Sequence, residues 1–297
     1  MRKNTVIIIG NGFDLCAGLD TSYVDFIKSD EFKKIIDKGN KLAIALFEKY
    51  NKDKWSDIEI YLKEYIKSET ELEIGEFENN YKDLKLALRD YLRRLNYNSA
   101  IIKESVQKLI NEKILRIGDE DIANRSTTIL DFNYSGWLRD YIWKERMKSF
   151  IIPEVEYKFV HGYLFDSDIE KLIFGIDEDS NVPTKYSFLL KAYGETYRDE
   201  VIKNTLLEAD EIIIFGHSLG ETDKMYFGDF FEALSNKSKT VNNIVIYFHD
   251  SKSKNELIAR LIEMTKYKYS KLSNVIKWES VYTHEFKGDM NFKMVKL

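Results

Sequence analysis

The sequence predicts an α/β fold whose mostly parallel, Rossmann-like sheet carries helices on both faces. Three observations predict it. An apolar run at Val6–Ile9 ends in a glycine turn, residues 28–120 have helical apolar spacing with almost no strand signal, and strand-like and helical segments alternate from Thr127 onward. Such alternation favours a parallel sheet with both faces covered. We interpret residues 1–297 as a single α/β domain with a helical insertion at 28–120, after the first strand–helix unit.

The first element is the strand at Val6–Ile9, followed by Gly10-Asn11-Gly12 and a helix-opening segment. Glycines at such a turn let backbone amides approach a phosphate, and the helix N-terminus favours the same anion. The turn therefore predicts a nucleotide site. The third glycine of the usual dinucleotide fingerprint would fall at Leu15, and the next glycine is Gly18, so the fingerprint alone is incomplete.

The predicted insertion contains apolar residues spaced by three or four, which indicates packed helices. These segments are Leu42–Phe47, Ile58–Ile66 and Tyr81–Leu95. Between the first two, the stretch from Trp55 to Glu59 contains two acids at i and i+2, which do not share a helix face. Either Ser56 or Asp57 is expected to cap a helix, with a pocket-facing acid as the alternative.

The remaining elements alternate. We expect strands at Thr128–Phe132, Phe159–Val160, Leu172–Phe174, Glu211–Phe215 and Asn243–Phe248, and helices at Gly136–Met147, Met225–Leu234 and Leu257–Thr265.

Composition narrows the function classes. The formal net charge of −5 gives no general attraction for nucleic acid or an anionic membrane, and the apolar runs are too short to span a bilayer. We expect a cytoplasmic protein without membrane or nucleic-acid partners. The single cysteine, Cys16, excludes an intrachain disulfide and a zinc site made of several thiolates, and no metal is expected.

Four polar turns follow predicted strands, and the carboxyl ends of parallel strands meet at one edge of a sheet. Each turn has an ordinary interpretation: Asn133 or Asp223 could cap a helix, and His161 could be a half-buried histidine. Their combination instead predicts one shared site. The turns are Gly10–Asp14, Asp131–Ser135, Val160–Gly162 and Phe215–Asp223.

Several stretches in this order resemble the bacterial AbiH family, whose members are associated with abortive infection of phage-infected cells. They are Ile9–Leu15, Gly18–Phe26, Trp55–Glu59, Phe132–Tyr134, His161–Gly162, Ile173–Asp177 and Phe215–Asp223. The resemblance implies an antiviral defence protein.

A more distant resemblance connects the chain with sirtuins and sirtuin-like NAD-consuming defence enzymes. Their Gly-x-Gly turn, Asn motif, His-Gly pair and Gly-x-Ser turn have similar counterparts here in the same order, and the fold implied is sirtuin-like. The chain departs from the pattern because no acid follows Asn133 and because Cys16 alone cannot form the four-cysteine zinc module of sirtuin deacylases. Protein deacylation is thereby disfavoured.

This resemblance implies hydrolysis of the nicotinamide–ribose bond of NAD, which would be a substrate. Asn133 would orient a water or a ribose hydroxyl, and His161 would be the general base. The Gly10 and Gly12 amides would hold the pyrophosphate, and Asp250 could contact the adenosine ribose or simply belong to a turn. The expected cofactor-binding residues are Gly10, Asn11, Gly12, Phe13, Asp14, Thr21, Ser22, Gly216, His217, Ser218 and Asp223.

Three alternatives stay open. Gly216–Gly220 fits a Gly-x-Ser-x-Gly nucleophile elbow, with Asp250 and His284 following Ser218 in the order of a serine hydrolase. The protein could also bind a nucleotide or a partner without catalysis, or the insertion could cleave nucleic acid. An effector held inactive until infection would need a switch, such as a homo-oligomer, a phage-derived trigger or a partner protein.

Overall fold

The computed structural model describes residues 3–53, 57–67, 73–100, 104–148, 154–177, 182–194, 199–281 and 294–296. Contacts divide the chain into two compact units. The first comprises Met1–Leu19, Tyr97–Val160 and Arg198–Leu297, and the second comprises Asp20–Asn96 and His161–Tyr197. The segment predicted as a helical insertion, 28–120, is thus divided between the units at Asn96. Whether the chain folds as one domain with an insertion stays a prediction.

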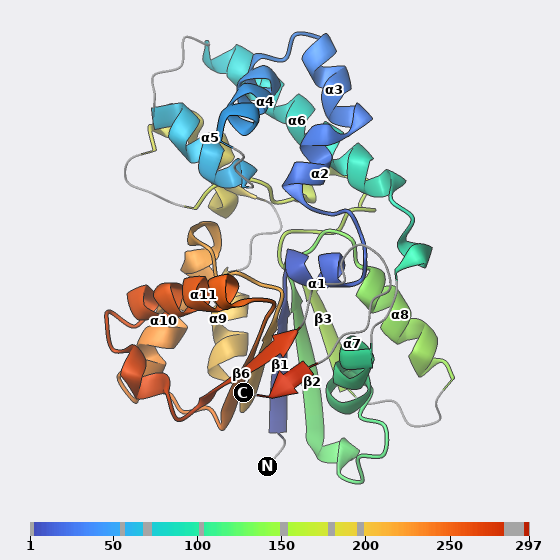
Figure 1. Ribbon diagram of the computed structural model, residues 1–297, viewed down its shortest axis with the longest axis vertical. Helices are drawn as coiled ribbons and strands as arrows, with labels where there is room; N and C mark the ends of the chain where they lie inside the picture. The colour runs from blue at the N-terminus through green and yellow to red at the C-terminus, as the bar shows by residue number, and fades with distance from the viewer. Residues whose placement is uncertain are drawn as a thin grey trace. The chain divides into compact units, whose positions relative to one another are not determined.

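The first unit contains one sheet with the strand order β3-β2-β1-β4-β5-β6-β7 (Figure 1). All neighbouring strands are parallel except β7, which is antiparallel to β6. The order of the first six is that of the doubly wound Rossmann fold, which confirms the predicted fold class. The strands are β1 Lys3–Ile9, β2 Arg125–Asp131, β3 Glu154–Phe159, β4 Glu211–Phe215, β5 Asn243–Phe248, β6 Ile276–Val281 and β7 Met294–Lys296.

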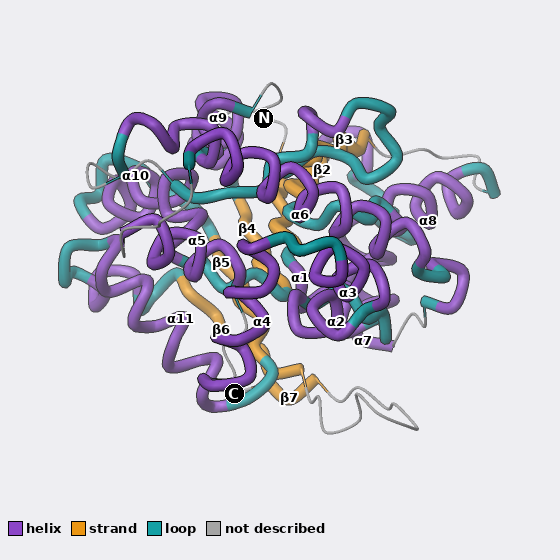
Figure 2. Tube along the Cα trace, turned by 90° about the horizontal axis from the view of Figure 1, so that it is seen from above, coloured by secondary structure: helices purple, strands orange, loops and turns teal. Residues whose placement is uncertain are grey.

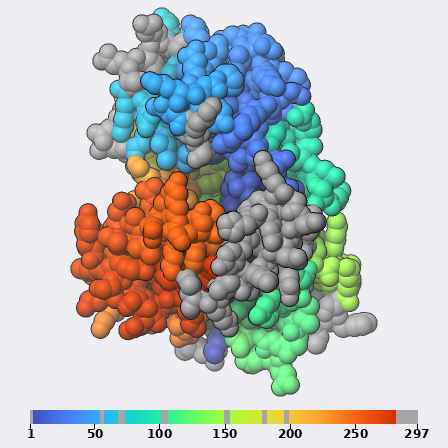
Figure 3. Space-filling view, viewed as in Figure 1, coloured from blue at the N-terminus to red at the C-terminus, as the bar shows by residue number. Residues whose placement is uncertain are grey.

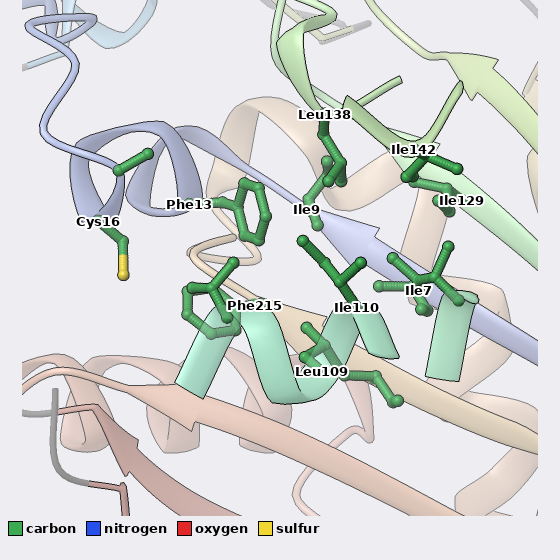
Figure 4. Packing of buried hydrophobic residues seen from close by; sticks show 14 of the residues in the cluster. Ile7, Ile9, Phe13, Cys16, Leu109, Ile110, Ile129, Leu138, Ile142 and Phe215 are labelled. Atoms are coloured by element: carbon green, nitrogen blue, oxygen red, sulfur yellow. The ribbon is translucent and has the colours of Figure 1, made fainter. Parts of the chain in front are cut away.

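Both faces of the central strands are buried, which explains their continuous apolar sequences. One face carries Ile7 and Ile9 of β1 with Ile129, Ile213 and Phe215 of its neighbours. Helical side chains cover this face, among them Phe13, Leu109, Ile110, Leu138 and Ile142 (Figure 4). The neighbouring residues Val6, Ile8, Ile212 and Ile214 point to the opposite face and are equally buried.

Helices of the first unit cover both faces of the sheet: from above, α9, α10 and α11 lie on one side of the strands and α7 and α8 on the other (Figure 2). Residues from α10 onward form the orange-to-red surface in Figure 3. The helices are α1 Asn11–Cys16, α7 Glu104–Leu109, α8 Trp137–Arg146, α9 Asp199–Leu207, α10 Lys224–Ser235 and α11 Ser251–Met264, with a π-helical turn at Ile110–Ile114 and 3₁₀ turns at Tyr97–Ser99, Ile122–Asn124, Glu221–Asp223 and Tyr269–Leu272.

The second unit is helical. α6 packs against α3 and α4, and the segment that follows His161 adds short 3₁₀ turns beside α6. The elements are α2 Tyr23–Lys28, α3 Asp30–Asp37, α4 Lys41–Asp53, α5 Ile58–Lys67 and α6 Ile74–Arg94, with 3₁₀ turns at Ile169–Lys171, Thr184–Leu189 and Lys191–Tyr193. Asp57 accepts hydrogen bonds from the amides of Glu59 and Ile60, so it is the cap predicted for α5, while Ser56 lies outside the described residues.

The strand predicted at Leu172–Phe174 is wrong. These residues form an irregular loop whose apolar side chains are buried within the second unit. The Ile173 amide donates to the His161 carbonyl at 2.8 Å, and the Tyr81 hydroxyl donates to the Phe174 carbonyl. The short apolar run at Leu172–Phe174 therefore indicates burial of its side chains, and it does not form a strand.

Candidate functional site

Three of the four polar turns lie together at the carboxyl edge of the sheet. Ile9 is paired with Asp131 of β2 on one side and with Phe215 of β4 on the other. The turn after β1 therefore lies between the turns that contain Asn133 and Gly216. The strand order reverses direction between β1 and β4, which is where doubly wound folds bind ligands.

The glycines of two of these turns allow direct backbone packing. A Cβ on Gly12 would lie 2.7 Å from the Gly216 Cα, and a Cβ on Gly216 would lie 2.2 Å from the Phe13 nitrogen. Gly216 also has a φ of +68°, a conformation that favours glycine. Larger side chains at Gly12 or Gly216 would force the turns apart.

Hydrogen bonds join the same two turns. The Gly10 amide donates to the Phe215 carbonyl at 3.1 Å, and the Gly12 amide donates to the Gly216 carbonyl at 2.9 Å. The two amides that the sequence predicts for a pyrophosphate are thus engaged within the protein. Asn11, at the first position of α1, has an exposed side chain.

Asn133 connects the β2 turn to the β1 turn. Its side chain is buried, and its Nδ2 donates to the Gly10 carbonyl at 3.2 Å. Its backbone amide donates to Asp131 Oδ1 at 2.8 Å. It does not cap α8, which begins at Trp137 after Gly136. The Asn133 side chain, which the sequence predicts as catalytic, therefore also holds the turn after β2 against the turn after β1.

Two buried carboxyl groups lie beneath these turns. Asp14 accepts hydrogen bonds from Ser135 Oγ at 2.8 Å and from Trp137 Nε1 at 2.7 Å. Burial raises the pKa of Asp14 to about 7. Asp131 accepts from the Tyr157 hydroxyl, and burial together with the charge of Asp14 raises the pKa of Asp131 well above its ordinary value. Asp14 was predicted as a ligand contact, but Asp131 was not, although an acid at the end of a buried strand is a visible signal.

His217 holds the turn after β4 in place. Its Nδ1 accepts the Leu219 amide at 3.0 Å, which places its ring proton on Nε2, 3.3 Å from the Asp223 carboxylate. Its ring also lies edge-on to Phe132, with centroids 4.3 Å apart. Both ring nitrogens are thus occupied, so His217 positions the turn. Asp223 precedes α10 as predicted for a cap, yet its carboxylate is directed to His217.

A cavity of about 260 Å³ opens beside these turns within the first unit. Its walls come from the turns after β1 and β4, the end of β5 and the first turns of α11. Phe215 and Tyr247 are stacked there, with ring centroids 4.9 Å apart, and Ser218 is exposed at the cavity. The lining residues are Gly12, Leu15, Cys16, Phe215, Gly216, His217, Ser218, Tyr247, Phe248, His249, Ser253, Glu256 and Leu257.

The other predicted site residues have local roles. Phe13 is buried and stacks on Trp137 at 5.4 Å. Thr21 and Ser22 belong to the second unit, where Ser22 caps α2 by accepting the Asp25 amide at 3.1 Å. His161 is buried in the second unit. The adjacent Gly162 has a φ of +85°, and a Cβ there would lie 2.1 Å from the Lys171 carbonyl oxygen.

The serine-hydrolase interpretation lacks the expected local geometry. A nucleophile elbow needs a helix immediately after the serine, whereas α10 begins only at Lys224, after a 3₁₀ turn at Glu221–Asp223. Asp250 caps α11 by accepting the Ser253 amide at 2.7 Å. His284, the predicted histidine of that triad, lies outside the described residues.

Two features are absent from the described residues. These residues contain no group of three or more His, Cys, Asp or Glu side chains placed to hold a metal ion. None of their helices combines the length and the apolar character that crossing a bilayer requires.

The fold and the cavity define a Rossmann-like α/β protein with a candidate ligand site at its switch point. The sequence matches the family described as "Bacteriophage abortive infection AbiH" over residues 6–247, and the chain belongs to this family. The family gives it a role in abortive-infection defence against phage. No curated protein and no solved structure matches the chain. The resemblance to sirtuins stays a prediction.

Proposed function

We propose that this AbiH protein binds a nucleotide, NAD, at the switch point of its sheet and hydrolyses the nicotinamide–ribose bond. The observation that carries the proposal is the cavity between α1 and the ends of β4 and β5. Ligands of doubly wound folds bind in the crevice at this edge. Loss of NAD from an infected cell would stop its metabolism before phage can multiply.

The chemistry of the cavity favours the uncharged parts of such a ligand. The half-buried Tyr247, which is stacked on Phe215, offers an aromatic face to a base, and the exposed Glu256 carboxylate can accept hydrogen bonds from ribose hydroxyls. No Lys or Arg occurs among the described residues that line the cavity. The pyrophosphate would accordingly lie outside it, toward Asn11, because the Gly10 and Gly12 amides are already occupied.

The proposed catalytic residues are Asn133 and His161. Asn133 would orient the attacking water or a ribose hydroxyl, and His161 would take up the proton as nicotinamide leaves. An imidazole nitrogen suits this step because its lone pair can accept a proton. In the reaction, water adds to the ribose C1′ as the bond to nicotinamide breaks, giving ADP-ribose and nicotinamide.

The test is release of nicotinamide from NAD by the purified protein, with and without a lysate of phage-infected cells. We expect release that falls at least 100-fold in His161→Gln and Asn133→Ala. Asn124→Ala, an exposed position in the same unit as Asn133, is the matched control and keeps full activity. An unfolding curve of each variant separates loss of catalysis from loss of the Asn133–Gly10 contact. Absence of release under both conditions contradicts the hydrolase proposal.

The second candidate is a nucleotide-binding protein without catalysis. It is favoured by the engagement of Asn133, His217 and the glycine-turn amides in bonds within the protein. In that case NAD would bind the wild type and be recovered intact. Recovery of unchanged NAD from a saturated complex, also after addition of the infected-cell lysate, would select this candidate.

A further inference from the structure

A second cavity, of about 250 Å³, lies entirely within the second unit. It is bordered by α6 and by the two loop segments that Figure 1 draws near α6 in yellow tones. It is separate from the cavity beside the turns after β1 and β4, called here the switch-point cavity, since the two share no lining residue. A volume of about 250 Å³ can enclose only a small ligand completely.

Two buried lysines contribute to this cavity, and they differ in how their charge is balanced. The Lys191 side chain is 0% exposed and forms an ion pair of 2.9 Å with Glu59, which is also buried. The Lys85 side chain is 9% exposed, and its ion pair with Glu170 is longer, 3.5 Å, to a carboxylate that is 57% exposed. A buried carboxylate therefore compensates the charge of Lys191, whereas the charge of Lys85 is compensated only by a longer ion pair to an exposed carboxylate.

Burying an ammonium group is strongly unfavourable unless close partners replace its hydration. A lysine can donate three hydrogen bonds, and one long contact to a largely solvated carboxylate replaces little of that hydration. Burial accordingly lowers the pKa of Lys85. An anion inside the cavity would supply the missing acceptors.

Aromatic side chains form part of the cavity wall, and Glu170 is the one acidic side chain among the described lining residues. Tyr81 stacks on Phe174 at 5.9 Å and lies 5.8 Å from Phe188. The Tyr81 hydroxyl donates to the Phe174 carbonyl, and burial raises the pKa of Tyr81, so it stays neutral.

We propose that this cavity binds a small carboxylate or phosphate anion through Lys85, and that the ligand displaces Glu170 from the lysine. Glu170 is then a competing group at the cavity mouth, because its exposed side chain can turn into solvent. The site would give the second unit a ligand of its own, separate from any nucleotide bound by the first unit.

The experiment titrates inorganic phosphate and, separately, succinate into the full-length protein at constant ionic strength, with binding followed by calorimetry. We expect binding by one or both probes that weakens at least tenfold in Lys85→Met. Methionine retains the volume of the buried stem, so the variant is expected to fold. Lys82→Met, on an exposed position of the same helix, is the matched control and binds as the wild type does.

Glu170→Gln provides an independent test. Removing the competing carboxylate should tighten binding severalfold, whereas a purely structural ion pair would leave affinity unchanged. Tighter binding of phosphate points to a phosphorylated ligand, and tighter binding of succinate points to a carboxylate. The proposal is overturned if neither probe binds at millimolar concentration, or if Lys85→Met binds both probes as the wild type does.

Discussion

Gly12 and Gly216 are required because two backbones meet where any side chain would collide. We expect Gly12→Ala to lower the free energy of unfolding by about 1–3 kcal/mol, since the new methyl must push the turn after β4 away. Urea unfolding measures the change.

Gly228→Ala is the control for this substitution. Gly228 lies within α10, and a Cβ there would meet no atom within 4 Å. Alanine should leave stability unchanged or raise it by up to about 1 kcal/mol through helix propensity. Equal effects of the two substitutions would show that the contact between the turns does not matter.

Asp14 makes stability depend on pH. Its pKa is about 7 in the folded protein, against an ordinary value of 3.8, so the unfolded chain loses this proton first as pH rises. Stability should therefore fall between about pH 4 and pH 7, by up to about 1.4 kcal/mol per pH unit from this group. Unfolding free energies measured across this range give the slope.

Asp14→Asn should make the slope shallower, because the amide does not titrate. Asp131 contributes in the same direction, so some slope should remain. Asp140→Asn removes an exposed acid of α8 and should leave the slope as in the wild type. An unchanged slope in Asp14→Asn would contradict the assignment of the proton to this carboxyl group.

The elements of the sheet differ in how well the sequence predicts them. β1, β2, β4 and β5 are buried on both faces and have apolar runs that local pattern detects. β3 carries Glu154, Glu156 and Lys158 in alternation, so only its end at Phe159 was expected. β6 alternates in a similar way and was missed. β3 lies at the edge of the sheet and β6 lies beside the short edge strand β7, and both are specified by the strands that pair with them, which local sequence does not contain.

The same limit applies to the candidate site. The positions of Gly12, Asn133 and Gly216 after apolar runs indicate a shared edge, because parallel strands end together. The partners of these residues could not be predicted, since they depend on contacts between distant segments. The bond from Asn133 to Gly10 and the engagement of His217 by Leu219 are examples.

The start of α11 depends on Asp250. Its carboxylate accepts the Ser253 amide, which lowers the pKa of Asp250. We expect Asp250→Ala to lower the unfolding free energy by about 0.5–2 kcal/mol and Asp250→Ser to restore most of it, because serine also caps helices. Failure of serine to restore stability would argue against capping.

For the molecule as a whole, membership of the AbiH family predicts a behaviour of infected cultures. Cells that express the protein should survive as a population when few are infected, and growth should stop when nearly all are infected. Growth curves at low and high ratios of phage to cells measure this. Survival of most cells at the high ratio would indicate that phage is blocked without loss of the host cell.

The proposed nucleotide site is tested most directly by titrating NAD into the purified protein. Ser218→Trp should fill the switch-point cavity, and Ser273→Trp, on the exposed segment before β6, is the control. We expect the wild type and Ser273→Trp to bind NAD equally and Ser218→Trp to bind at least tenfold more weakly. Equal affinity of all three proteins, or no binding by the wild type, would contradict the proposed site.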